Sequence, residues 1–270
     1  MQPTTTGRFR VHDRRQRPDV DESAEEFTLV EVPPEPIDPS APGAANAFDP
    51  LFVSAEGYDG ELETQVDALV PGVVVDATLA WDDGTAWFTE VAVVREDRFR
   101  FAEDVTGIFE AAVEAWNALR ADGEAFGSVT TRSTDGEPNG ALYLFADGPG
   151  GDTFGELRAG RLPIEPLVAR VNERLADDQP REVFVLRPAD HSFVLVHVVF
   201  DRDGVLARTI RDTYDLGFGL ALGLTEGNPG DDEDGADRDD GKEADRDSDI
   251  DGKEADRDSD IDGFDLRDRR

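Results

Sequence analysis

Apolar and polar residues alternate along several short segments in the first part of the chain, as they do in strands with one buried face. The clearest case is Val73–Trp81, where every second residue is apolar while Asp76 and Thr78 fall on the opposite face. Other runs predict strands at Arg8–Val11, Phe27–Val32, Leu51–Val53 and Ala86–Val94, and a short helix over Glu61–Leu69. Three strands, a helix and two strands is the element order of an OB-type barrel, so the sequence predicts an OB-like β-rich half over residues 1–101.

The second part of the chain changes to helical spacing. Apolar residues from Val105 to Leu119 recur on one helical face, with Asp104 as the expected cap, and a second helix is expected to start near Pro163. The predicted strands are Ser128–Thr131, Ala141–Phe145, Glu182–Leu186, Phe193–Phe200 and Val205–Thr213. Tight turns join neighbouring strands, which favours an antiparallel sheet with two helices in the order αββαβββ over residues 102–227. The fold class is therefore α+β, and Phe193–Phe200, apolar on both faces, is the expected central strand.

Two stretches lack such patterns. Residues 33–47 contain five prolines and many small residues, which indicates an extended insert. Residues 228–270 are strongly acidic and repeat the unit DGKEADRDSDI at 240–250 and 251–261. One isoleucine in each unit cannot form an apolar seam, so we expect a disordered tail.

The charge balance changes the picture of the environment. The chain has 62 acidic and 27 basic residues, a formal net charge of −35, and its only lysines are Lys242 and Lys253. Such self-repulsion is tolerable at molar salt, where the Debye length is only ~3 Å. We found no signal-like start and no apolar run long enough for a membrane span. The sequence predicts a soluble, cytoplasmic protein of an extreme halophile; the alternative is an acidic protein of ordinary cells that binds cations or basic partners.

Several kinds of chemistry are excluded by composition. The absence of cysteine removes thiol catalysis and cysteine-ligated metals, and the absence of lysine before the tail removes phosphate-loop and Schiff-base lysines. With three histidines we expect no histidine-rich metal site, and we assign no metal or cofactor, although K⁺ or Mg²⁺ can collect on the acidic surface. The glycines from Gly148 to Gly155 lack dinucleotide-binding spacing and are interpreted as a loop.

Three groups of residues remain as candidates for a site. Asp190 and His191 can form an acid–base pair, whereas His197, between two valines, is expected to be a core histidine with one partner. Polar residues in two turns can bind a polar ligand or a cation, or simply face solvent: Arg132, Asp135, Glu137, Asn139, Asp201, Asp203 and Asp212. The third group suggests single-stranded nucleic acid, with arginines for phosphates and tryptophans for bases: Arg8, Arg10, Arg14, Arg15, Arg17, Trp81 and Trp87. The alternative is that these arginines pair with nearby carboxylates and the tryptophans fill core.

Three segments, DALVPGVVVDATLAWDDGTAWF, TRSTDGEPNGALYLFADGPG and PREVFVLRPADHSFVLVHVVFDRDGVLARTIRDTYD, resemble an uncharacterised family of haloarchaeal proteins. The resemblance covers roughly residues 7–215 and implies a haloarchaeal origin, but it transfers no activity and no catalytic residues. Our leading hypothesis is a non-enzymatic binding or regulatory module with a protein partner or a small ligand. The alternatives are a carboxylate-based, Mg²⁺-dependent enzyme and a single-stranded nucleic-acid binder.

Overall fold

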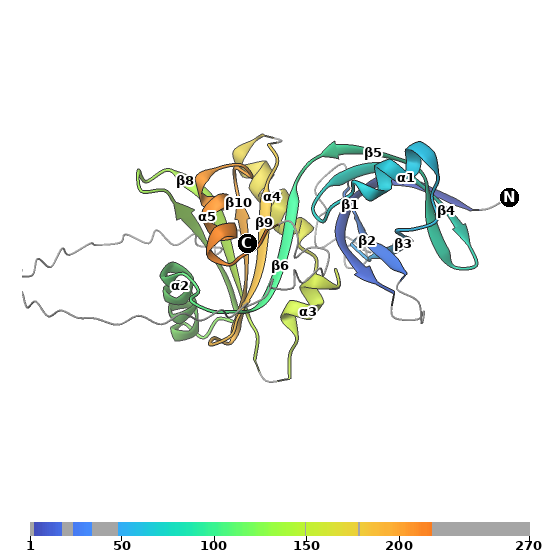
Figure 1. Cartoon of the computed structure of the whole chain (residues 1–270). Helices are drawn as coiled ribbons and strands as arrows, with labels where there is room; N and C mark the ends of the chain where they lie inside the picture. Colours follow the sequence, from blue (N-terminus) through green and yellow to red (C-terminus); the bar gives the residue numbers. More distant parts are fainter. Residues whose placement is uncertain (1–2, 18–23, 34–47, 149, 178, 218–270) are drawn as a thin grey trace, which may run out of the picture.

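The computed structural model describes residues 3–17, 24–33, 48–148, 150–177 and 179–217 (Figure 1). The expected acidic tail, residues 228–270, and all but Pro33 of the expected insert lie outside this described part. Two β-sheets and five helices make up the described chain, so the fold class is α+β, as predicted. None of the helices in these ranges is long and apolar enough to cross a membrane.

The first sheet contains five strands that close on themselves. They are β1 (Thr4–Gln16), β2 (Glu25–Glu31), β3 (Leu51–Ser54), β4 (Val74–Asp82) and β5 (Thr85–Arg95), and helix α1 (Gly60–Asp67) joins β3 to β4. The strands pair in the order β1-β2-β3-β5-β4, and β4 pairs back with β1. Only the short β3–β5 pairing is parallel. The predicted order of three strands, one helix and two strands is therefore confirmed.

Alternation explains the core of this sheet. Phe9 and Val11 on β1, and Val75 and Leu79 on β4, point inward and are at most 1 % exposed. After Val11 the register shifts by one residue at a bulge, which redirects the end of β1. Near this bulge Arg10, His12 and Asp13 are also buried, because they contact the second part of the protein.

The second sheet is mixed rather than antiparallel. Its strands are β6 (Arg98–Val105), β7 (Phe126–Arg132), β8 (Pro138–Ala146), β9 (Glu182–Pro188) and β10 (Phe193–Val199), in the order β6-β9-β10-β8-β7. The β6–β9 pair is parallel and the other pairs are antiparallel. All of β10 is buried in the middle of the sheet, which confirms the expected central strand.

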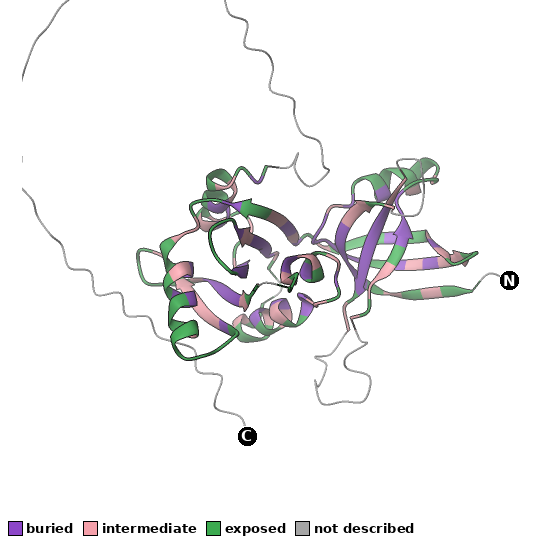
Figure 2. Ribbon diagram, turned by 90° about the horizontal axis from the view of Figure 1, so that it is seen from below, coloured by how far each residue is buried: buried purple, intermediate pink, exposed green. Residues whose placement is uncertain are grey.

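Helices cover both faces of the second sheet, and buried positions run through the strands between them (Figure 2). Helices α2 (Glu110–Ala121) and α5 (Val205–Thr213) share one apolar cluster with one face. Helices α3 (Thr153–Arg158) and α4 (Glu165–Leu175) share the cluster on the other face. The prediction of two helices in this half is wrong, because the described residues contain four.

Three local predictions need correction. Val205–Thr213 is a helix and not a strand, since Ala207 and Ile210 are buried three residues apart while Arg208 and Thr209 between them are exposed. Asp104 does not cap α2: it lies in β6 with φ 57°, and the helix begins six residues later, at Glu110. The glycine-rich stretch is not only a loop, because α3 starts within it and the Asp152 side chain accepts a hydrogen bond from the Gly155 N–H.

Strand β6 was missed altogether, and it spans the expected boundary between residues 101 and 102. Its charged residues hide the strand pattern, yet Phe99 and Phe101 alternate with Arg98 and Arg100. Because β6 pairs with β9, residues 98–101 belong to the second sheet.

Candidate functional site

Three of the N-terminal arginines form ion pairs with carboxylates of their own sheet. Arg8 pairs with Asp76 at 2.8 Å, and Arg14 and Arg15 pair with Glu25 and Glu26 at 2.7 and 2.9 Å. The Arg17 N–H donates to the Ala24 carbonyl. The ion pairs of Arg8, Arg14 and Arg15 fit the alternative interpretation, in which the arginines pair with nearby carboxylates.

The two candidate tryptophans are half-buried in the same half. The Trp81 Nε1–H donates to Thr5 Oγ1 at 3.0 Å, and the ring packs against the core of the closed sheet. Trp87 meets Tyr58 edge-on, with ring centroids 6.2 Å apart. Neither ring is an open stacking platform.

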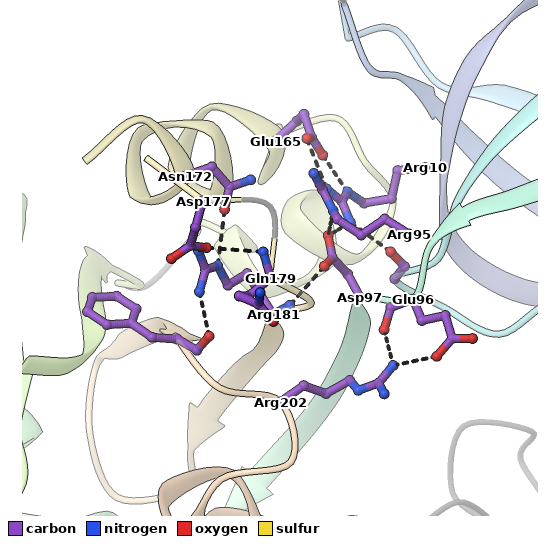
Figure 3. A network of polar contacts seen from close by, with 12 residues as sticks. Arg10, Arg95, Glu96, Asp97, Glu165, Asn172, Asp177, Gln179, Arg181 and Arg202 are labelled. Carbon is purple, nitrogen blue, oxygen red and sulfur yellow. Dashed lines mark hydrogen bonds and ion pairs between the residues drawn. The ribbon is translucent and has the colours of Figure 1, made fainter. Parts of the chain in front are cut away.

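Arg10 is placed differently from its neighbours, because it is only 1 % exposed and lies between the two halves (Figure 3). It donates two hydrogen bonds to Glu165 at the start of α4, one to Asp97 at 2.8 Å and one to the Gly72 carbonyl at 2.7 Å. Burial lowers the pKa of this guanidinium, but the two carboxylates more than offset that effect and raise it overall. In this structure the Arg10 guanidinium is thus enclosed by protein partners and does not face solvent.

Asp97 is the centre of this network. Its carboxylate is fully buried and accepts hydrogen bonds from Arg10, from Arg95 and from the Arg181 N–H, each at 2.8 Å. Figure 3 shows that the network continues through Arg181 to Asn172 and Asp177. Such complete pairing is what buried charges require, and it identifies the network as a structural joint between the halves.

A second set of contacts strengthens the same joint. His12 is 2 % exposed, and its Nε2 donates to the Leu157 carbonyl at 2.7 Å. Burial lowers the pKa of His12 to about 4, so the ring is neutral near pH 7. Asp13 pairs with Arg158 at 3.3 Å. A cavity beside them, bordered also by Phe99 and Arg100, measures only about 30 Å³, which is room for a water molecule and not for a substrate.

The other predicted candidates do not form a catalytic group. Asp190 and His191 are exposed, and the His191 ring stacks on Phe193. His197 is buried as expected, with one partner, Thr131 Oγ1, at 3.1 Å from its Nε2, and burial lowers its pKa to about 4.

Most of the interactions of the polar turn residues are with neighbours in the same turn. Arg132 donates to the Gly136 carbonyl within its own hairpin, where Asp135 and Glu137 are exposed, and Asn139 lies at the start of β8. Asp201 accepts from the Asp203 N–H, Asp203 pairs with Arg202, and Asp212 is exposed on α5. Within the described residues, no group of three or more His, Cys, Asp or Glu side chains is arranged to hold a metal ion.

A larger pocket lies between α4 and the β7 side of the second sheet. It has a volume of about 330 Å³. Its floor is the sheet face formed by β7 and β8, and its roof is the last part of α4. Three of the floor residues, Ser128, Thr130 and Ala141, have small side chains and leave space beneath α4. Ten residues line it: Ser128, Val129, Thr130, Ala141, Tyr143, Arg170, Val171, Glu173, Arg174 and Phe200.

Two guanidinium groups give this pocket its polarity. Arg170 and Arg174 are four residues apart on α4 and therefore lie on one side of the helix. Arg174 donates to Thr130 Oγ1 at 3.1 Å, across the mouth of the pocket. Burial raises the pKa of Tyr143 on the floor, and the charges of Arg170 and Arg174 act in the opposite direction. The Tyr143 hydroxyl donates to the Leu167 carbonyl at 3.4 Å. Glu173 adds one exposed carboxylate at the rim.

The pocket residues were not singled out from the sequence. The apolar side of α4 was visible in its spacing, and so were Arg170 and Arg174 at positions i and i+4. The sequence does not indicate that the small residues of β7 and β8 lie opposite these arginines. Only the pairing of Ser128 with Tyr143 and of Thr130 with Ala141 brings them to one face.

The comparisons with known proteins place the chain in a family. No curated protein matches it. The matching family model extends over residues 1–221, which includes the entire described part of the chain, so this protein belongs to DUF6663, a family of unknown function.

Proposed function

We propose that this protein is a binding module whose ligand is a small organic anion with an apolar body, held in the pocket beneath α4. The observation that carries the proposal is the pair of guanidinium groups, Arg170 and Arg174, above a mainly apolar floor of about 330 Å³. Ligand pockets of this kind are largely apolar and contain a few polar groups that orient the ligand.

The charge of the pocket supports an anion. The chain as a whole carries a net charge of −35, so a site with two arginines and one glutamate stands out from its surroundings. A guanidinium matches a carboxylate with two parallel N–H groups, which favours this anion over a spherical ion such as chloride.

The pocket favours binding over catalysis. None of the three histidines is among the described residues that line it, so Ser128 has no histidine beside it to act as a base. The Tyr143 hydroxyl donates to the Leu167 carbonyl at 3.4 Å, so recognition of the ligand's charge falls to the guanidinium groups.

Calorimetric titration of the full chain in molar KCl tests the proposal, with benzoate and hexanoate as probes and benzyl alcohol as the neutral counterpart. We expect the carboxylates to bind and benzyl alcohol to bind at least about tenfold more weakly, which is a difference of about 1.4 kcal/mol. Arg170→Gln should weaken benzoate binding by a similar factor, and Arg161→Gln, an exposed arginine outside the pocket, should leave it unchanged. Equal binding of benzyl alcohol and benzoate, or no binding of any probe, would contradict the proposal.

A second candidate function concerns the first half, which we infer to be an OB-like small β-barrel ending near Arg95. The strand order β1-β2-β3-β5-β4 and the position of α1 between β3 and β4 support this inference. One observation favours a single-stranded nucleic acid there: Phe52 on β3 is 40 % exposed, and the Arg15 guanidinium lies 4.5 Å from its ring centre. Fluorescence anisotropy with labelled oligo(dT) in molar KCl tests it. Binding that Phe52→Ala abolishes would support this function, and no binding would reject it.

We also infer a haloarchaeal origin and a cytoplasmic location at molar salt. The support is the acidic composition and the absence of lysine from residues 1–241. In the described part, arginine alone supplies the cationic partners of the carboxylates.

A further inference from the structure

The second sheet has two edges of different character. β6 forms the edge toward the first sheet, and β7 forms the edge on the far side (Figure 1). β6 carries Arg98, Arg100, Glu103 and Asp104 and is interrupted by a bulge after Ala102. Charges and bulges are the usual means by which a sheet edge avoids pairing with another chain.

β7 has such protection only at its last position, where Arg132 is charged and the register shifts after Thr131. Residues 126–131 read FGSVTT and contain no charge, in a chain of which 33 % of the residues are charged. Phe126 at the start of the strand is 37 % exposed, with its ring against Phe145 at a centroid distance of 4.8 Å. Over residues 126–131 the edge is thus an uncharged segment with high β-propensity and an exposed aromatic ring.

The backbone of β7 presents its polar groups in a regular row. The Ala146 N–H donates to the Ala125 carbonyl at 2.8 Å, so Ala125 belongs to a hydrogen-bonded pair with β8. Hydrogen-bonded and non-bonded pairs alternate along an antiparallel ladder. The N–H and C=O groups of Phe126, Ser128 and Thr130 therefore point away from β8, toward the open edge.

We propose that β7 pairs with β7 of a second copy of this chain, antiparallel and around a two-fold axis at Ser128. This pairing joins the outward groups of all three residues and places Phe126 opposite the partner subunit's Thr130. The second sheets of the two copies become one continuous sheet. The inference goes beyond the proposed ligand site and does not depend on it.

Charge and symmetry identify a second copy as the occupant. At molar salt, with a Debye length of ~3 Å, like charges repel only in direct contact, so two chains of net charge −35 pack together most easily where both surfaces are uncharged. A basic partner protein would be drawn to the acidic surfaces instead of this neutral strand. A strand that pairs with itself around a two-fold axis also closes the assembly, so it leaves no edge for further growth.

Light scattering on the full chain during size-exclusion chromatography in molar KCl tests the dimer. We expect twice the mass of one chain for the wild type, and the mass of one chain for Ser128→Glu and for Ser128→Lys, because like charges then face each other across the axis. Mixing the two variants should restore a dimer that contains one chain of each. Thr134→Glu, an exposed position in the turn beyond β7, is the matched control and should remain dimeric.

Far-ultraviolet circular dichroism of both Ser128 variants tests whether the fold is intact. The mixing experiment tests the same point, because only folded variants can form a dimer with each other. A wild-type chain that is monomeric at all concentrations overturns the proposal and leaves the edge open to an extended peptide of another protein. A dimer that both Ser128 variants preserve also overturns it, since the contact would then lie elsewhere.

Discussion

Arg10 on β1 and Glu165 on α4, 155 positions apart in the chain, form a buried two-point ion pair in which Arg10 Nη2 lies 3.0 Å from Glu165 Oε1. Neither half of the protein contains both partners. Each half alone would carry an uncompensated charge on the surface that the other half covers, so the pair makes the folding of the two halves interdependent.

The first prediction follows from this pair. Arg10→Met leaves Glu165 buried without its partner, and we expect the free energy of unfolding to fall by about 3–5 kcal/mol. Arg8→Met is the matched control on the same strand; its pair with Asp76 is half-exposed, so we expect almost no change. Urea unfolding in molar KCl, followed by circular dichroism, measures both variants. Equal effects of the two substitutions would show that the buried pair does not hold the halves together.

The second prediction concerns the closest backbone contact between the halves. Gly72 has φ +106°, and a Cβ there would lie 2.4 Å from Arg98 Cα. Gly72→Ala should therefore destabilise the protein by about 3 kcal/mol or more, since it adds a backbone clash to an unfavourable φ.

Gly136→Ala separates these two causes. Gly136 also has a positive φ, +81°, but nothing lies within 4 Å of its Cβ position. We expect a loss of about 1–2 kcal/mol from the backbone conformation alone. Thermal unfolding of both variants measures the difference, and the explanation fails if Gly72→Ala is the milder of the two.

The third prediction concerns acid. Burial lowers the pKa of His12 and of His197 to about 4, below the usual value for histidine of about 6.5. Between these values the unfolded chain binds more protons than the folded chain, so the stability contributed by each neutral ring is complete above pH 6.5 and is lost as the pH falls toward 4. The loss is at most about 3 kcal/mol for each histidine.

Substitution isolates this contribution from that of the carboxylates. His12→Gln keeps a donor for the Leu157 carbonyl and removes the titration, so its stability should fall less steeply between pH 6.5 and 4 than that of the wild type. His191→Gln, at an exposed position, should retain the wild-type slope. Urea midpoints across this pH range measure the slopes, and three identical slopes would contradict the role given to His12.

The fourth prediction concerns salt. The net charge of −35 is screened at molar KCl and is much less screened at ~0.1 M, where the Debye length grows to ~10 Å. We expect the described part of the chain to lose structure as KCl is lowered over this range. Circular dichroism follows the change, with sucrose added at low salt as a control for general stabilisation. A spectrum that stays constant would reject the halophilic interpretation.

The closed first sheet was largely predictable because its signals are local. Its strands have one face in an apolar core and one face turned outward, which produces alternation along segments such as Val74–Asp82. Strand β10 was equally clear, since burial on both faces produces an apolar run that only His197 interrupts. The core histidine His197 followed from its apolar neighbours on that strand.

The errors occur where local and tertiary preferences differ. Val205–Thr213 is rich in β-branched residues, which favour strands, yet its apolar residues fit a helix that packs on the second sheet. Strand β6 carries four charged residues, so its sequence lacks a clear strand pattern. Its pairing with β9, a distant segment of the chain, makes it a strand.

The sequence by itself determined the kind of protein and most of its elements: an acidic α+β chain in which apolar periodicity marks strands and helices. Tertiary structure decided which charges are buried and where a ligand has room. Arg8 and Arg10 are equivalent in the sequence, but one meets solvent and the other the second half of the protein. The pocket, likewise, needs Ser128, Ala141 and Arg170 from three elements. The periodicity of apolar residues indicates only which face of a segment is buried. A binding site depends on which distant segments of the chain lie next to one another.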